Sequence, residues 1–220
     1  MFISQNFYLT NCYKNMGTST ASKPDKKEEK QNNAKVFSIR ISLKGISPTI
    51  WRRVEVPYNF TLHELHMVIQ AAMGWENYHL YDFTIGKTHF SVPSDDWPSE
   101  DEDSEKTYIN KLVFIGKSAT MTYEYDFGDD WIHTVKIDKI LPENEDVDYP
   151  RCVSGKRACP PEDSGGPYGY LNMLNILEDP KNEEYNDIKE WIGEDFDPEY
   201  FNLEEANDRV NDYLDMDYGF

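Results

Sequence analysis

Residues 120–137, with the sequence TMTYEYDFGDDWIHTVKI, contain the clearest structural signal in the chain. Bulky side chains alternate with smaller polar ones on both sides of the tetrapeptide Phe127-Gly-Asp-Asp130. An alternation with a period of two is typical of a strand with one buried face, and Gly and Asp favour tight turns. The stretch therefore predicts a β-hairpin with an acidic turn.

The flanking segments predict the rest of the fold. Alternating patterns indicate three more strands, at residues 37–43, 50–56 and 79–85. Thr61 and Glu64 form a capping box that begins a helix, and Gly74 is the expected end of that helix. Apolar stripes at helical spacing follow Pro167. We therefore expect an α+β fold, a single-domain roll with a mixed or antiparallel sheet, one early helix and a C-terminal helical cluster.

The chain of 220 residues divides into a tail and a domain. Residues 1–34 are largely polar, so we expect a disordered basic tail, with the domain at residues 35–220. No apolar run approaches the roughly 20 residues needed to cross a bilayer, and the first residues are too polar for a signal peptide. Three cysteines are an odd number, which argues against a disulfide scaffold and favours the cytoplasm.

Charge is distributed unevenly along the sequence. The chain has 41 acidic and 22 basic residues, for a net charge of −19. Residues 1–60 hold ten basic and four acidic residues, whereas residues 61–220 hold twelve basic and thirty-seven acidic ones. The acidic part should repel a phosphate backbone, so nucleic-acid contact is expected only through the N-terminal tail. The expected partner is a protein or a small molecule, and no membrane contact is expected.

Residues 142–167 are a long connection, rich in Pro and Gly, with little regular pattern. Cys152 and Cys159 lie in it with six residues between them. Three interpretations stay open. The thiolates could bind zinc, although zinc usually takes four ligands, two of them more closely spaced. Neighbouring basic residues could stabilise a reactive thiolate, or both cysteines could be structural.

The predicted hairpin places three carboxylates near a histidine: Asp126, Asp129, Asp130 and His133. Carboxylates with a histidine could bind Mg²⁺ or act as general acid and base. The structural alternative is that Asp and Gly serve the turn, while the inward histidine is hydrogen-bonded in the core. His63 and His66 lie three positions apart on the predicted helix, which suits metal ligands or half-buried histidines beside the sheet.

Several longer motifs resemble one known family. They are Pro48-Thr-Ile-Trp-Arg-Arg-Val54, Leu62-His-Glu-Leu-His66, Ile69-Gln-Ala-Ala-Met-Gly-Trp75, Tyr125-Asp-Phe-Gly-Asp-Asp-Trp131, Tyr149-Pro-Arg-Cys152, Ala158-Cys-Pro-Pro-Glu-Asp163 and Asp195-Phe-Asp-Pro198. In this order, over about residues 35–215, they resemble the Ri-plasmid open-reading-frame-three-like domain. The resemblance implies a compact α+β roll found on plasmids and mobile elements, and it implies no established activity.

Two details qualify the resemblance. Some family members are labelled as transposon passenger or "TnpR" proteins, a label that implies a resolvase, but this chain has no basic DNA-binding domain and no recognisable serine-recombinase motif. Many members carry a third cysteine where this chain has Ser164. A serine hydroxyl is a poor substitute for a thiolate, which weakens a three-thiolate metal site.

The sequence therefore predicts a cytosolic interaction or ligand-binding module associated with mobile elements. The candidate ligand-binding residues share polar or aromatic side chains within these motifs: Trp51, Arg52, Trp75, His79, Asp126, Asp129, Asp130, Trp131, His133, Arg151, Glu162 and Asp163. Cys152 and Cys159 are the candidate zinc ligands. A common site requires that the acidic turn and the cysteine-bearing loop meet. Two alternatives are a metal-dependent phosphoester hydrolase using the turn carboxylates with His133, and a DNA-associated accessory protein of a mobile element.

Overall fold

The structure, a computed structural model, describes residues 35–94, 100–112 and 120–215. Its strands are β1 (Lys35–Leu43), β2 (Trp51–Pro57), β3 (Tyr81–Ile85), β4 (Thr88–Ser91), β5 (Glu102–Asp103), β6 (Thr120–Tyr125), β7 (Trp131–Pro142) and β8 (Arg151–Lys156). Its helices are α1 (Leu62–Met73), α2 (Ile109–Leu112), α3 (Gly166–Glu178), α4 (Tyr185–Ile192) and α5 (Leu203–Asp215). The fold is α+β, as predicted, while the expected tail at residues 1–34 lies outside the described residues.

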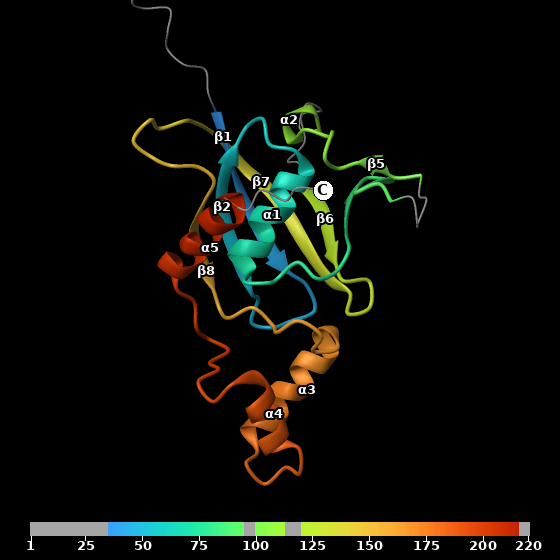
Figure 1. Ribbon diagram of the computed structural model, residues 1–220, viewed down its shortest axis with the longest axis vertical. Coiled ribbons are helices and arrows are strands. Elements are labelled where there is room, and N and C mark those ends of the chain that lie inside the picture. The colour runs from blue at the N-terminus through green and yellow to red at the C-terminus, as the bar shows by residue number, and fades with distance from the viewer. Residues whose placement is uncertain (1–34, 95–99, 113–119, 216–220) are drawn as a thin grey trace, which may run out of the picture. The chain divides into compact units, whose positions relative to one another are not determined.

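The described strands form one mixed sheet in the order β5-β4-β3-β6-β7-β1-β2-β8 (Figure 1). Neighbouring strands are antiparallel except for the parallel β4–β5 pair. The predicted hairpin is confirmed, because β6 and β7 pair from Tyr125 opposite Trp131 to Thr120 opposite Lys136. Alternate side chains of the hairpin and of β2 are buried, which places the hydrophobic core on one face of the sheet.

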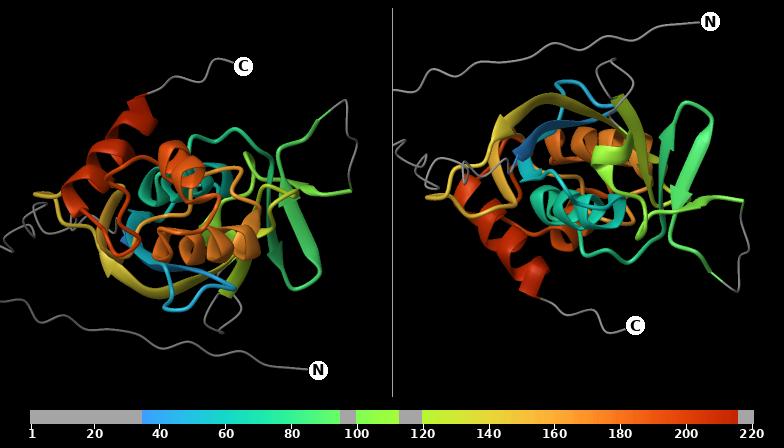
Figure 2. Two further views of the ribbon diagram at one scale, coloured as in Figure 1. Left: turned by 90° about the horizontal axis from the view of Figure 1, so that it is seen from below. Right: turned by 90° about the horizontal axis from the view of Figure 1, so that it is seen from above.

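Helix α1 lies across that face of the sheet (Figure 2). Its N-terminus has the predicted capping box, in which Thr61 Oγ1 accepts from Glu64 N (3.1 Å) and Glu64 Oε2 accepts from Thr61 N (2.6 Å). Its C-terminus ends at Gly74, which adopts the left-handed conformation with φ of 99° and donates to Gln70 O (2.8 Å). The sequence therefore predicts both ends of this helix.

Two arginines from other elements bind the last carbonyls of α1. Arg52 Nε, on β2, donates to Ala72 O (2.8 Å), and Arg209 Nε, on α5, donates to Ala71 O (3.0 Å). These carbonyls have no partners within a helix, and the helix dipole favours cations at this end. Since α1 has no basic residue in its own last turn, the two guanidinium groups also tie the helix to β2 and α5.

Three parts of the fold differ from the sequence expectation. The connection after residue 142 contains β8, which pairs with β2 at an edge of the sheet. A register shift opposite Arg53 and Val54 interrupts the alternation of β8, which explains why its pattern is weak. β3 begins at Tyr81 rather than His79, and the positive φ of Asn77 marks the turn before it. Strands β4 and β5 and helix α2 are too short to show a periodicity.

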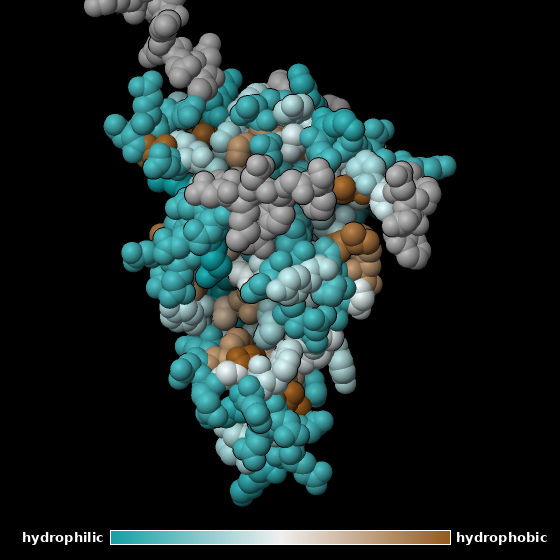
Figure 3. All heavy atoms as spheres, in the orientation of Figure 1, coloured by the Kyte–Doolittle hydropathy of each residue, from teal (hydrophilic) through white to brown (hydrophobic). Residues whose placement is uncertain are grey.

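The C-terminal third is helical, as predicted, with its helices on two parts of the fold. α3 packs against α4, and α5 packs against α1 and β8 (Figures 1 and 2). Pro167 stands in the first turn of α3, where its missing N–H costs nothing. The surface in Figure 3 is mostly hydrophilic, in agreement with the acidic composition. Among the described helices, none combines the length and the apolar character that a bilayer crossing requires.

Candidate functional site

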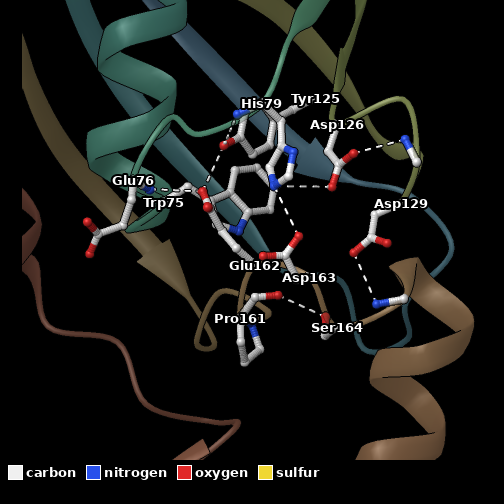
Figure 4. Close-up of polar contacts among 12 residues, drawn as sticks. Trp75, Glu76, His79, Tyr125, Asp126, Asp129, Pro161, Glu162, Asp163 and Ser164 are labelled. Carbon is white, nitrogen blue, oxygen red and sulfur yellow. Dashed lines mark hydrogen bonds and ion pairs between the residues drawn. The ribbon is translucent and has the colours of Figure 1, made fainter.

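Three loops meet in the region that contains most of the candidate residues: residues 74–80, residues 126–130 and residues 157–165. Trp75 Nε1 donates to Pro160 O (3.0 Å), which joins the first loop to the third. Gly165 N donates to Asp129 Oδ2 (3.0 Å), which joins the hairpin turn to the third loop (Figure 4). The acidic turn and the cysteine-bearing loop therefore touch. We call the following set the acidic junction: His79, Asp126, Asp129, Glu162 and Asp163.

Gly166 allows this close approach. Its φ is +66°, and a Cβ atom at this position would lie 2.2 Å from the backbone oxygen of Asp129. Only glycine adopts this φ readily, and no side chain fits into that distance. The glycine at the start of α3 is therefore required by the contact between the loop and the hairpin turn.

His79 faces two carboxylates at the acidic junction. Its Nε2 atom lies 3.2 Å from Asp163 Oδ1 and 3.6 Å from Asp126 Oδ2 (Figure 4). This nitrogen is buried, yet neither contact has hydrogen-bond geometry. Asp126 Oδ1 accepts from Gly128 N (2.9 Å), which fixes the carboxylate in the turn. Within the described ranges, these three side chains form the one group of three or more His, Cys, Asp or Glu that could hold a metal ion.

Glu162 links the loops through hydrogen bonds. Its Oε1 atom accepts from Tyr125 OH (2.8 Å) and from Glu76 N (2.9 Å) (Figure 4). Burial and this carboxylate both raise the pKa of Tyr125, so its phenol stays protonated and donates. No Lys or Arg of the described chain forms an ion pair with a carboxylate of the acidic junction. Among the described residues, His79 is therefore the one basic side chain that faces carboxylates of the junction.

The backbone of the three loops is left-handed at five residues that are not glycine: Asn77, Asp126, Asp130 and Asp163, with φ between 55° and 59°, and Arg157, with φ of 69°. Asn and Asp tolerate this conformation better than other side chains. Such residues are concentrated at functional sites. The three aspartates therefore suit the left-handed backbone and also supply the negative charge of this region.

A pocket of about 840 Å³ opens beside the junction, and His79 borders both. Its lining includes stacked rings on α1 and β3: His63, His66 and Tyr81. The His66 and Tyr81 rings are almost parallel, with centroids 3.6 Å apart. Tyr78 and Phe127 also line the pocket and are 72% and 52% exposed. The pocket is therefore aromatic and open to solvent.

Hydrogen bonds indicate which ring nitrogen of His66 carries the proton. Its Nε2 lies 2.9 Å from Asn77 Oδ1, and its Nδ1 lies 2.8 Å from Tyr123 OH, which also accepts from Gln70 Nε2 (2.8 Å). Nε2–H therefore donates to Asn77, and Nδ1 accepts from Tyr123. Burial lowers the pKa of His66 well below its ordinary value and also lowers that of His63. Both rings are neutral at pH 7.

The pocket lining carries net negative charge. It contains Asp101 and Glu105, and no lysine or arginine among the described residues. The inner histidines, His63 and His66, are neutral, so they add no positive charge to the lining. Aromatic faces beside carboxylates attract cations and disfavour phosphate or carboxylate groups.

Three candidate residues lie away from the junction. Trp51 alternates with the inward Arg52 along β2, so it is on the opposite face of the sheet, where Arg40 stacks on its ring at 4.1 Å. Arg52 binds the end of α1, and Arg151 pairs with Glu55 (2.7 Å). These arginines and this tryptophan stabilise the strands and do not line the site.

The four residues of the expected hairpin metal site do not converge. Asp126 joins His79, whereas Asp130 faces Glu124, whose pKa is raised by burial and by this neighbouring carboxylate. His133 is inward because it follows the alternation of β7, and it is fully buried. The phosphoester-hydrolase alternative built on this set is therefore not favoured.

Trp131 and His133 lie in the core, in contact with Trp75, at centroid distances of 6.0 Å and 5.3 Å. Among the described residues, neither ring nitrogen of His133 has a partner in hydrogen-bond geometry. Burial lowers the pKa of His133 to about 3, and the nearby backbone of Trp131 and Tyr123 opposes this only in part. His133 is thus a neutral residue of the core.

Cys152 and Cys159 are free thiols. Burial raises the pKa of both, and this outweighs the opposite effect of Arg52. Both therefore stay protonated at neutral pH, which disfavours the reactive-thiolate interpretation. Within the described part of the chain, neither thiol belongs to a group of three ligand-type side chains.

Sequence reasoning missed the pocket and the hydrogen-bond network behind it. His66 was considered, but its partners Asn77 and Tyr123 are 11 and 57 positions away. A useful local signal was the pair of aromatic residues, Tyr78 and Phe127, next to the candidate His79 and Asp126. Both remain exposed beside the site instead of entering the core.

Comparison with known proteins agrees with this architecture. Residues 35–205 match the family described as "Plasmid pRiA4b ORF-3-like protein". The uncharacterized protein y4hQ of Sinorhizobium fredii (strain NBRC 101917 / NGR234) is 36% identical over 180 residues, which cover 81% of this chain and 92% of that protein. The crystal structure of a protein of unknown function from Methanosarcina mazei Go1 is similar, with 43% identity and a TM-score of 0.71, covering 78% of this chain and 97% of that one. The chain therefore belongs to the family of plasmid pRiA4b ORF-3-like proteins.

Proposed function

We propose that the chain is a ligand-binding module whose pocket holds a small organic cation, an amine with an aromatic or aliphatic body. The supporting observation is the lining, which combines aromatic rings with Asp101 and Glu105 and, in the described ranges, lacks lysine and arginine. A cation within about 6 Å of an aromatic ring face is attracted by the ring. The volume of about 840 Å³ also suits a small molecule.

The same lining works against anionic ligands. A phosphoester or a nucleic-acid backbone would meet two carboxylates and two neutral histidines. The family relatives described above carry no name that indicates hydrolysis or DNA binding. We also propose a cytoplasmic location, supported by the free thiols, and an association with mobile elements, supported by the plasmid family.

Three probes of nearly equal size and different charge test the proposal. Tyramine is a cation, 4-ethylphenol is neutral and 4-hydroxyphenylacetate is an anion at pH 7. Calorimetric titrations of the full chain in the presence of a chelator should give the tightest binding for tyramine, by about fivefold or more over 4-ethylphenol. The anion should bind most weakly. Failure of all three to bind, or tightest binding of the anion, would contradict the proposal.

A charge-removing variant locates the binding site. Glu105 is an exposed pocket residue, so Glu105→Gln should weaken tyramine binding about three- to fivefold and leave 4-ethylphenol binding unchanged. Glu190 is an exposed carboxylate on α4, outside the pocket lining, so Glu190→Gln is the matched control. An equal loss in both variants would mean that the amine responds only to the overall negative charge.

A further inference from the structure

We propose that His79, Asp126 and Asp163 bind one divalent transition-metal ion at the acidic junction. This site is separate from the expected zinc site at the cysteines and does not depend on what the pocket holds. One imidazole nitrogen and two carboxylate oxygens suit zinc, manganese or iron(II), whereas Mg²⁺ and Ca²⁺ prefer oxygen ligands alone.

The spacing of the atoms fits a shared ion. His79 Nε2 lies 3.2 Å and 3.6 Å from the two carboxylate oxygens, and all three ligand atoms lie within 4.8 Å of one another. Metal bonds to histidine nitrogen and carboxylate oxygen are about 2.0–2.2 Å long, which places neighbouring ligand atoms about 3.0–3.5 Å apart. Only small side-chain adjustments would bring the three atoms to bonding distance.

The orientation of His79 is the second observation. Its Nε2 atom is buried and faces both carboxylates, but it makes no hydrogen bond to either one. A buried imidazole nitrogen that faces two carboxylate oxygens, with no hydrogen bond to either, is in a position to share a metal ion with both of them.

The charge of the three ligands and the hydrogen bond that orients Asp126 also favour a bound metal ion. Histidine binds a metal through a neutral imidazole, so a ligand set of one histidine and two carboxylates carries a charge of −2, which a divalent ion balances. No Lys or Arg of the described residues is paired with these carboxylates. Gly128 N holds the second oxygen of Asp126 at 2.9 Å, and such outer hydrogen bonds orient ligating carboxylates. Three protein ligands leave room for water or for part of a bound ligand.

Cobalt(II) is the best probe, because its visible spectrum separates nitrogen and oxygen ligands from thiolates. The full chain is treated with a chelator, desalted and titrated with Co²⁺ alone, without an amine. We expect one equivalent to bind, with visible ligand-field bands and no thiolate-to-cobalt charge-transfer band. Uptake below about 0.2 equivalents, or a strong thiolate band, would overturn the proposal.

Two aspartate variants assign the ion to its ligands. The Asp163 side chain is 72% exposed with a left-handed backbone that Asn also tolerates, so Asp163→Asn should keep the fold, as checked by circular dichroism. It should weaken Co²⁺ binding about tenfold or more. Asp187→Asn, at an exposed position on α4, is the matched control and should bind as the unmodified chain does. Equal affinity in all three proteins would refute the ligand set. The amine titrations use a chelator, so the two proposals fail independently.

Discussion

The acidic junction and the surroundings of Arg52 both contain ionisable side chains, but the two regions differ in how these side chains are paired. At the junction, the carboxylates have no basic partner among the described residues except His79. Arg52, by contrast, is buried and donates to the carbonyls of Ala72, Trp51 and Lys156 at 2.8–3.1 Å, while burial keeps the neighbouring thiols protonated. The comparison teaches that an ionisable residue indicates a function only where the fold leaves its charge without a counter-charge or its polar atoms without hydrogen bonds.

Breaking the junction should have the largest effect on stability. In Gly166→Ala, the new Cβ atom would lie 2.2 Å from the Asp129 oxygen, and the positive φ would be strained as well. The loop has to move away from the hairpin turn, so we expect a loss of about 3 kcal/mol or more in the free energy of unfolding. Urea unfolding followed by tryptophan fluorescence measures it.

Gly86 supplies the control for this variant. Its φ is +67°, almost the same, but a Cβ atom there would contact nothing within 4 Å. Gly86→Ala should therefore cost only about 1 kcal/mol, from backbone strain alone. Equal losses in the two alanine variants would show that the close contact between the loop and the turn is unimportant.

Removing the guanidinium group tests the structural role of Arg52. In Arg52→Met, three buried or half-buried carbonyls lose a donor, and one of them, that of Ala72, lies in the last turn of α1. We expect a loss of about 3 kcal/mol in unfolding free energy. Arg53→Met removes a more exposed arginine that pairs with Asp138 (2.8 Å), so it should cost less than about 1 kcal/mol. Similar losses for both variants would contradict the distinction between the two neighbours.

His133 makes the interior sensitive to acid. Its pKa is about 3 in the folded chain and about 6.5 when unfolded, so between these values the unfolded chain binds the extra proton. Its contribution to stability is complete above about pH 6.5 and declines as the pH falls towards 3. We expect about 2 kcal/mol to be lost between pH 7 and pH 5. In His133→Met this part of the loss should disappear, while the part due to His66 remains. An unchanged pH dependence of urea unfolding would contradict this prediction.

Local patterns were sufficient for much of the fold. The hairpin, the capping box at Thr61 and the helix end at Gly74 depend on neighbouring residues, and all three are confirmed. β8 was missed because its pairing partner, β2, is about 100 positions earlier in the sequence and a register shift interrupts its pattern. Long-range pairing of this kind leaves no period in a single sequence.

The candidate site could be predicted only in part, for the same reason. The motifs identified His79, Asp126 and Asp163, which the fold brings together. They also included Trp51, which lies on the opposite face of the sheet, and Arg151, which pairs with Glu55. Nothing in the local sequence excluded these two residues. The sequence suggested that the acidic turn and the cysteine-bearing loop meet, but the contact itself, between residues 129 and 165, is visible only in the three-dimensional structure. Spacing along the chain identifies residue types, whereas their convergence depends on tertiary structure.

The smallest predicted effects distinguish two adjacent carboxylates of the turn. Asp129 Oδ2 accepts from Gly165 N at 3.0 Å, so Asp129→Asn replaces a charged acceptor by a neutral one and should lower the unfolding free energy by about 0.5 kcal/mol. Asp130 instead faces the like-charged Glu124. Asp130→Asn keeps a residue that tolerates the left-handed backbone and removes this repulsion, so it should raise the stability by a few tenths of a kcal/mol. Urea unfolding at pH 7 with a chelator compares the two variants, and NMR titration of Glu124 should show its pKa falling only in Asp130→Asn. Changes of the same sign would mean that net charge, and not the position of each carboxylate, determines the effect of this turn.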